Sequence, residues 1–389
     1  MANVESRFPG RGRVLGDGTI LLTDLPADML QKVVHSIQLA HHMALAAPTC
    51  RVVSVAVLNA FKARPFSGEA VTLAPKHTNM IGDVAAAPDG RIVTAAHDRT
   101  VRVWTGGTCV NTIRAHTESI PAVAVLPDGA FVSGSEDCTA KLWSRDGVLE
   151  RTFAVGSHVD CIEALPDGVH FVVGLGWANR DNRGPNVGDI RLYHIDGTLV
   201  HTFKHTNFNS ALALAVTRDG QHIISGCGYC GDDFVNVWSI ATLSLVSTCA
   251  GHTNGVRVVA AMPDSQRILS AGGESDTAVR VWLLNGTLEN IFTLHDKSYH
   301  ATGAVNALVA LPDNQHALTG AADTTCSVKL FNVNDGSVLR NIKILAHPQR
   351  YFDRLETACV TGLALLPDGL RVVVVNFSDA RIVYHGLAL

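Results

Sequence analysis

The sequence predicts an all-β fold, a seven-bladed β-propeller of four-stranded antiparallel blades preceded by a short helical N-terminal segment. A Pro-Asp-Gly-like turn followed by a β-branched or aromatic run recurs seven times. Most repeats continue with a small residue, an Asp and a second run that ends in Trp, Tyr or Phe. The step from Pro88 to Pro127 equals the step from Trp104 to Trp143. A period of about 40 residues with four strands per unit is typical of a propeller blade.

Each repeat is marked by its turn and by the aromatic residue that ends its third strand. The turns begin at Pro88, Pro127, Pro166, Arg218, Pro263, Pro312 and Pro367, and the aromatics are Trp104, Trp143, Tyr193, Trp238, Trp282, Phe331 and Tyr384. We expect the innermost strands at residues 84–87, 123–126, 161–165, 212–216, 258–261, 307–311 and 361–366. Many of their side chains are small, as a narrow central channel requires.

The last repeat ends at Tyr384 and leaves too few residues for a fourth strand. Residues 70–74 precede the first repeat and have the pattern of a fourth strand without a blade. We expect them to pair with residues 381–384, because this pairing closes the ring and leaves no long exposed edge. The predicted organisation is therefore a flexible leader over 1–18, a helical segment over 19–66 and the propeller over 67–389.

Four repeats share a His, a Ser or Thr, an Asp and a Trp at matching positions. The sets are His77, Thr94, Asp98 and Trp104; His116, Ser133, Asp137 and Trp143; His205, Ser225, Asp232 and Trp238; and His252, Ser270, Asp276 and Trp282. In these residues the chain resembles the WD-repeat (β-transducin repeat) family over roughly residues 70–389. Two departures are the missing Asp after each Trp and the replacement of Trp by Phe331 and Tyr384 in the last two blades. The resemblance implies a propeller that presents surfaces to protein partners.

A His, Ser and Asp set also occurs in hydrolases, but an active site occurs once, beside an oxyanion hole. Because this set recurs, we interpret it as structural: Asp accepts from His, His contacts Ser or Thr, and the Trp N–H finds a partner. The best copies are His116, Ser133, Asp137 and Trp143, and His252, Ser270, Asp276 and Trp282. Glu163 is the one acidic residue expected in an inner strand, and a single carboxylate is a poor active site. We therefore expect no catalytic residue and no enzyme activity.

Composition points away from several other classes. The 389 residues are 47% hydrophobic and 17% charged, with a net charge of −4, so neither nucleic acid nor an anionic membrane is an expected partner. Nine scattered cysteines without a secretory signal favour reduced thiols in the cytoplasm or nucleus. Cys227 and Cys230 form a Cys-x-x-Cys pair, but a structural zinc site needs four ligands and no second pair exists. We expect neither a metal nor a cofactor.

Surplus chain length is concentrated in the connections between the second and third strands of a blade, and between successive blades. Strand parity places both kinds of connection on one face of the ring. These connections contain residue types that dominate protein interfaces. We predict that a protein partner contacts Trp177, Arg180, Arg183, Tyr229, Tyr299, His300, Arg350, Tyr351, Phe352 and Arg354. The alternative is that these side chains only hold the loops to the ring.

The segment before the propeller carries a second resemblance. Residues 25–30, Val33, Val34, Ile37 and residues 49–51 are similar to parts of an F-box, a small helical bundle that docks on the adaptor of a cullin-based ubiquitin ligase. This resemblance implies a substrate-recognition subunit whose propeller holds the substrate. The alternative is a helical brace packed on the propeller. Our first hypothesis is a non-catalytic protein-interaction scaffold, the second is the ligase subunit, and a propeller enzyme comes last.

Overall fold

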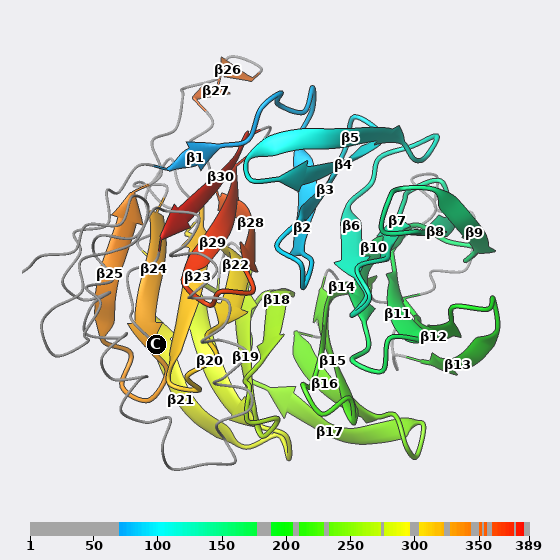
Figure 1. Cartoon of the computed structure of the whole chain (residues 1–389). Helices are drawn as coiled ribbons and strands as arrows, with labels where there is room; N and C mark the ends of the chain where they lie inside the picture. The colour runs from blue at the N-terminus through cyan, green and yellow to red at the C-terminus, as the bar shows by residue number, and fades with distance from the viewer. Residues whose placement is uncertain are drawn as a thin grey trace, which may run out of the picture. The chain divides into compact units, whose positions relative to one another are not determined.

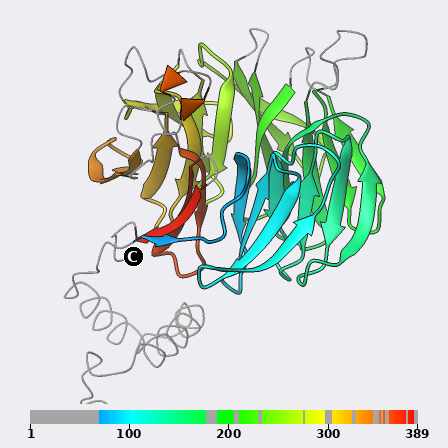
Figure 2. The same ribbon diagram turned by 90° about the horizontal axis from the view of Figure 1, so that it is seen from above.

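The computed structural model describes residues 70–176, 188–204, 210–228, 233–273, 276–295, 303–322, 327–343, 350–351, 354–355, 360–376 and 379–384. Within these ranges, seven four-stranded antiparallel sheets surround a central axis (Figures 1 and 2). The fold is thus the seven-bladed β-propeller that the repeat period predicts. It forms one compact unit, Glu69–Gly386. No helix in the described ranges is long and apolar enough to cross a membrane. The predicted leader and helical segment lie outside the described residues.

Six blades are each built from four consecutive strands, which we call a, b, c and d from the channel outward. The first three blades are β2 (Ile81–Ala86), β3 (Ile92–Ala96), β4 (Thr100–Thr105) and β5 (Thr108–Arg114); β6 (Ala122–Val125), β7 (Phe131–Gly134), β8 (Thr139–Trp143) and β9 (Leu149–Ala154); and β10 (Val159–Ala164), β11 (His170–Leu175), β12 (Ile190–His194) and β13 (Leu199–Phe203). The next three are β14 (Ser210–Val216), β15 (His222–Gly228), β16 (Phe234–Ser239) and β17 (Ser244–Ala250); β18 (Val256–Ala261), β19 (Arg267–Gly272), β20 (Ala278–Leu283) and β21 (Leu288–Thr293); and β22 (Val305–Ala310), β23 (His316–Ala321), β24 (Ser327–Asn332) and β25 (Val338–Lys343).

The seventh blade combines the two ends of the propeller sequence. It contains β28 (Val360–Leu365), β29 (Arg371–Asn376), β30 (Asp379–Tyr384) and, as its outer strand, β1 (Val71–Thr72). β1 pairs antiparallel with β30, Val71 opposite Ile382 and Thr72 opposite Arg381. The Leu73 N–H donates to the Ala380 carbonyl at 2.9 Å, and the Leu73 side chain is buried. The first strand in the sequence is therefore hydrogen-bonded to the last.

The a–b turns use one recurring device. In blade 1 the Asp89 carboxylate accepts from the Arg91 N–H at 3.1 Å, and Gly90 has a φ of 85°. Blades 5 and 6 place Ser265 and Asn314 at that left-handed position, with φ values of 54° and 59°. A carboxylate that hydrogen-bonds its own backbone two residues on, followed by a positive φ, gives a tight reversal. This explains why the Pro-Asp-Gly pattern marks each blade so clearly in the sequence.

The hydrophobic core lies mainly between blades rather than within them. One cluster joins Val101 and Val103 of blade 1 to Phe131 and Trp143 of blade 2, whose rings stack with centroids 6.2 Å apart. Other clusters join blades 2 and 3, 3 and 4, 4 and 5, 5 and 6, and 7 and 1. Burying apolar area contributes about 25 cal/mol per Å². Blades 1 to 5 therefore each share a described core cluster with both neighbours and depend on them for their stability.

Two expectations about the strands are wrong. The inner strands begin earlier than predicted because, in six of the seven described a–b pairs, a β-bulge near the start of strand a interrupts the alternation of side chains.

In blade 7 the position of the Trp is occupied by Val383, which pairs with Val372, and Tyr384 lies one residue beyond it. In blade 6 the corresponding pair is Phe331 with Ala317. No indole is needed in blade 7, since Val374 replaces the Ser or Thr that would accept its N–H.

Closure of the ring predicts that β1 is required for solubility. A chain that lacks residues 1–76 loses β1 and the buried Leu73, and exposes the edge of β30 to pairing with other chains. We expect its melting temperature to fall by at least about 5 °C and its solubility to drop. A chain that lacks residues 1–69 retains β1 and is the control. Equal melting temperature and solubility of the two truncated chains would contradict the closing role of β1.

Candidate functional site

The order of the strands gives the propeller two unlike faces. Turns a–b and c–d form one face, which we call the turn face; connections b–c and d–a form the other, which we call the loop face. Turns on the turn face are short and alike: Gly90 N–H donates to the Ala87 carbonyl at 2.9 Å, and Gly129 N–H donates to the Leu126 carbonyl at 2.9 Å. The loop face carries the long connections, from β11 to β12 and from β25 to β28.

Most of the predicted partner-contacting residues lie outside the described residues. These are Trp177, Arg180, Arg183, Tyr229, Tyr299, His300 and Phe352. Arg350 and Tyr351 form β26 (Arg350–Tyr351), and Arg354 belongs to β27 (Arg354–Leu355), which pairs with it. This hairpin is part of the connection from blade 6 to blade 7. The side chains of these three residues lie outside the described part of the structure, so their contact with a partner stays a prediction.

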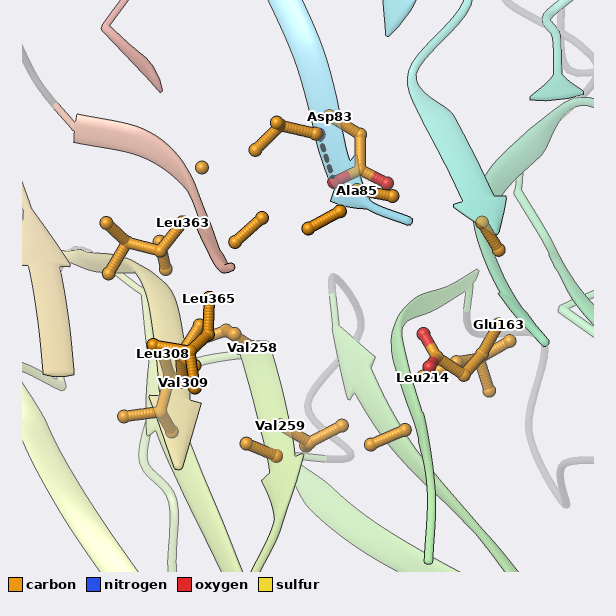
Figure 3. A pocket seen from close by; sticks show the side chains of 18 of the residues that line it. Asp83, Ala85, Glu163, Leu214, Val258, Val259, Leu308, Val309, Leu363 and Leu365 are labelled. Carbon is orange, nitrogen blue, oxygen red and sulfur yellow. Dashed lines mark hydrogen bonds between the residues drawn. The ribbon is translucent and has the colours of Figure 1, made fainter. Parts of the chain in front are cut away.

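A cavity of about 480 Å³ lies between the inner strands, and all seven blades contribute to its lining (Figure 3). Its described lining is mostly Ala, Val and Leu, and its polar members are Asp83, Glu163, Asn306 and Thr361. The expectation that Glu163 is the lone acidic residue of the inner strands is wrong. Asp83 lies in β2 and Asp160 in β10, both within the stretches that the bulges add to the predicted strands.

Asp83 joins two blades. Its carboxylate accepts from the Val84 N–H at 2.8 Å and, across the blade boundary, from the Val123 N–H at 3.0 Å. Burial raises the pKa of Asp83 to about 7, although these two N–H donors act in the opposite direction. The pKa of Asp160 is raised to about 6 by burial and by the charge of Glu136.

Glu163 lies in the same cavity and makes no hydrogen bond with a described residue. Burial, followed by the charge of Asp83, raises its pKa to about 8. A carboxyl group with a raised pKa can act as a general acid or base near neutral pH. Hydrolysis also needs a nucleophile and donors for the developing negative charge. Among the described lining residues, only Asn306 and Thr361 add other polar side chains.

The repeated four-residue sets are brought together inside their blades. In blade 2, His116 Nδ1 lies 2.9 Å from Asp137 Oδ2 and His116 Nε2 lies 2.8 Å from Ser133 Oγ, which accepts from Trp143 Nε1 at 2.9 Å. Blade 1 has the same three contacts at 2.9, 2.8 and 2.9 Å, and blade 5 at 2.8, 2.7 and 2.7 Å. We call each such chain of hydrogen bonds a relay.

The relay uses a neutral histidine and an ionised aspartate. Burial lowers the pKa of His116, which favours an imidazole that donates through Nδ1 and accepts through Nε2. Burial opposes the ionisation of Asp137, but hydrogen bonds from Thr139 and His116 outweigh it and hold its pKa below the usual value. Asp137 also accepts from the Thr117 N–H at 3.1 Å. Thr117 lies in the d–a link from β5 to β6, so the relay holds this link in place.

In the other blades, the described residues show part of the relay or none of it. In blade 4, Trp238 Nε1 donates to Ser225 Oγ at 2.9 Å, while His205 and Asp232 lie outside the described residues. Blade 6 contains a relay histidine that the sequence analysis missed: His295 Nε2 lies 2.9 Å from Thr319 Oγ1. The signal in the sequence was a His two residues after the preceding outer strand, as in the relays of blades 2 and 5. Blade 6 has no Trp to complete the set of four residues.

Sequence reasoning also missed a cation on strand c, two residues before the blade aromatic. Lys141 Nζ donates to the Ala115 carbonyl at 2.7 Å, just before the relay histidine His116. Arg102 donates to the Lys76 carbonyl at 2.9 Å, before His77. Cations at this position are Arg102, Lys141, Arg191, Arg280 and Lys329, and in blade 7 Arg381 precedes Val383 by the same two residues. Their regular spacing was the available signal, and the contacts to backbone carbonyls fix the base of the d–a links.

Blade 3 departs from the pattern. Gly156, with a φ of 74°, takes the place of the relay histidine, and Val173 takes the place of the Ser. Ser157 Oγ instead donates to the Gly176 carbonyl at 2.8 Å. Gly176 begins the long connection between β11 and β12, so the blade without the relay also carries a large insertion on the loop face.

Comparison with known proteins agrees with this architecture. The family model described as WD domain, G-beta repeat, matches residues 69–105, 107–144 and 243–282. These ranges include the Trp residues of blades 1, 2 and 5. The chain therefore carries WD repeats within its seven-bladed propeller.

A relative among curated proteins shares a short stretch with this chain. It is cilia- and flagella-associated protein 52 of Chlamydomonas reinhardtii, 30% identical over 87 residues. The match covers 22% of this chain and 13% of that protein, so the chain spans only a small part of the relative's length.

The raised pKa of Glu163 predicts a pH-dependent cost to stability. The folded-state pKa of about 8 lies above the unfolded value of about 4.3, so the folded protein binds this proton more tightly. The resulting stability is fully present below about pH 4 and is lost as the pH rises through about 8. E163Q should therefore raise the free energy of unfolding at pH 9 by about 1–3 kcal/mol, with a smaller gain at pH 5.

Denaturant unfolding at the two pH values measures this difference. Glu150→Gln, on the exposed outer strand β9, is the matched control and should change little at either pH. A gain for E163Q that is equal at pH 5 and pH 9 would show that the charge of Glu163 is not its cause.

The relay predicts a cost in stability when one member is removed. Asp137→Ala leaves His116 Nδ1 and the Thr117 N–H without their acceptor. We expect unfolding to require about 1–3 kcal/mol less free energy, measured by denaturant titration. Asp146→Ala, in an exposed turn of the same blade, should cost less than about 0.5 kcal/mol. Equal costs for the two variants would argue against the structural interpretation.

Proposed function

We propose that this protein is a non-catalytic interaction scaffold that binds protein partners through the loop face of its WD-repeat propeller. The observation that carries the proposal is the contrast between the two faces. The turn face repeats one short turn, whereas the loop face holds the long connections, including those from β11 to β12 and from β25 to β28. Loops of variable length on a rigid scaffold are where binding residues usually lie.

The chemistry of the ring supports binding rather than catalysis. The His, Ser and Asp sets are repeated, buried and hydrogen-bonded within their own blades, so their lone pairs and protons are already used. Among the described lining residues of the channel, the hydroxyl of Thr361 already donates to the Val375 carbonyl, and no histidine lies in the lining to act as its base. A partner laid over the channel mouth would contact several blades at once, and a fixed ring costs little ordering entropy on binding.

The proposed partners are proteins, in the cytoplasm or nucleus. The net charge of −4 supplies no basic surface for nucleic acid. Cys109, Cys138, Cys161 and Cys249, which lie in the described ranges, are free thiols. Free thiols fit a reducing compartment.

A second proposed function is that of substrate-recognition subunit in a cullin-based ubiquitin ligase. The observation that favours it is the F-box-like pattern of residues 25–51, which would dock on the ligase adaptor while the loop face holds the substrate. Both functions use the same face of the propeller. They differ in whether residues 19–66 bind a partner of their own.

The face is tested by capturing partners from native extract. Trp177→Ala or Tyr351→Ala should weaken a captured partner about thirtyfold without lowering the melting temperature, because interface anchors typically contribute about 2 kcal/mol or more. Arg145→Ala and Asp196→Ala on the turn face are the controls; both side chains are more than half exposed. Normal binding by the loop-face variants with loss in the controls would show that the turn face binds.

Capture with residues 67–389 separates the two functions in the same experiment. Under the ligase proposal, the shortened chain loses the cullin adaptor and keeps the substrate. Under the scaffold proposal, both chains capture the same proteins and neither captures the adaptor.

A further inference from the structure

Blade 3 carries a pair of histidines on the turn face, away from the loops discussed above. His170 begins β11, just after the a–b turn, and His194 ends β12, just before the c–d turn. The two residues are direct cross-strand partners. The Ile195 N–H donates to the Val169 carbonyl at 2.9 Å, which makes the next pair, His170 and His194, a non-hydrogen-bonded one. Side chains approach each other more closely at such a pair.

The two imidazole rings are at the separation that a shared metal ion requires. Their centroids lie 4.9 Å apart, with an angle of 72° between the planes. A tetrahedral zinc ion bonds imidazole nitrogens at about 2.0–2.1 Å, so the centroids of two rings on one ion lie about 5 Å apart. Neither ring is sealed in the core, since the side chains are 28% and 33% exposed.

Each ring also has a carboxylate behind it. His170 Nδ1 lies 2.7 Å from Asp167 Oδ2, and His194 Nδ1 lies 3.0 Å from Asp196 Oδ1. The Asp196 N–H donates to His194 Nδ1 at 3.2 Å, so this nitrogen is an acceptor in this structure, and metal binding through Nε2 requires the other tautomer, whose Nδ1–H faces Asp196 Oδ1. Nε2 of both rings has no hydrogen-bond partner among the described residues. Histidines that bind metals usually donate their other N–H to a carboxylate, as the contact of His170 with Asp167 allows.

A turn-stabilising role explains only half of this arrangement. A cation three residues after the turn Asp recurs in other blades, as in Asp264 with Arg267 and Asp313 with His316. His170 follows that pattern. At the position of His194, however, the other blades have Thr105, Ser144, Ser239, Leu283, Asn332 and Tyr384. Within the described strands, blade 3 is the one in which two histidines lie opposite each other, each beside an Asp.

We propose that His170 and His194 form a two-histidine site for a first-row divalent transition-metal ion such as Zn²⁺. Imidazole suits zinc, copper and nickel, and water would complete the coordination. No group of three or more His, Cys, Asp or Glu side chains is arranged to hold a metal in the described ranges. The site therefore supplies two protein ligands. A bound ion would tie strand b to strand c in a blade that lacks the relay.

Titration calorimetry of the full chain with ZnCl₂, under reducing conditions after treatment with a chelator, tests the site. We expect one zinc equivalent to be lost in His170→Ala and in His194→Ala. Asp196→Ala should weaken that equivalent about tenfold, as loss of a supporting carboxylate typically does. Zinc should also raise the melting temperature of the wild type and of neither histidine variant.

His316→Ala is the matched control. His316 sits on the same turn position of blade 6, beside Asp313, but faces Asn332 across the strands. It should bind zinc like the wild type. His170→Gln guards against a folding defect, because it should match the wild-type melting temperature without zinc and still lose the equivalent. Unchanged isotherms in both His170 and His194 variants, or an equal loss in His316→Ala, would overturn the proposal.

Discussion

The structure depends on the apolar surface that each blade buries against its two neighbours. The described core clusters draw their members from adjacent blades, as Val101 of blade 1 does with Phe131 of blade 2. A blade at an open end would leave one such surface in water, at a cost of about 25 cal/mol per Å². The pairing of β1 with β30 removes that end, since it makes the seventh blade from both ends of the propeller sequence. The ring is therefore stable only as a whole.

Polar groups are then arranged so that the packed ring holds its loops in place. The relays satisfy His, Ser and Trp inside a blade, and through Asp137 they also fix the d–a link of blade 2 by its Thr117 N–H. Lys141 adds a second contact to the same link at the Ala115 carbonyl. Buried polar groups that are fully paired favour one arrangement of the chain over others. The result is a rigid base from which the connections of the loop face emerge.

The fold could be predicted from sequence because its signals are local and repeated. A turn such as Asp89 with Gly90 encodes a reversal in neighbouring residues, and seven copies set the period. Asp83 and Asp160 fall outside the predicted inner strands because a bulge adds a residue that the alternation of side chains does not show. Tyr384 does not take the position of the Trp in the other blades. Blade 7 has no acceptor for an indole N–H, so its aromatic residue is not held at that position of the strand.

The candidate site was less predictable for a related reason. A residue such as Trp177 belongs to an insertion that occurs once, so no second copy gives its place, and the composition of the insertion is its only signal. The pairing of His170 with His194 depends on the register of β11 and β12, which the sequence does not state directly. Repetition identifies what holds the ring together, while functional residues are found where the repeat is broken.

Blade 3 concentrates these departures. It has Gly156 in place of the relay histidine, the long connection that starts at Gly176, and the carboxylates of Asp160 and Glu163 on its inner strand. Each of these features works against stability, through a missing hydrogen-bond chain, a longer loop or a buried charge. Natural sequences often keep such local costs at functional sites. Because these costs coincide with one of the two long connections of the loop face, that from β11 to β12, blade 3 is the part of the ring in which the proposed recognition of a partner is best tested.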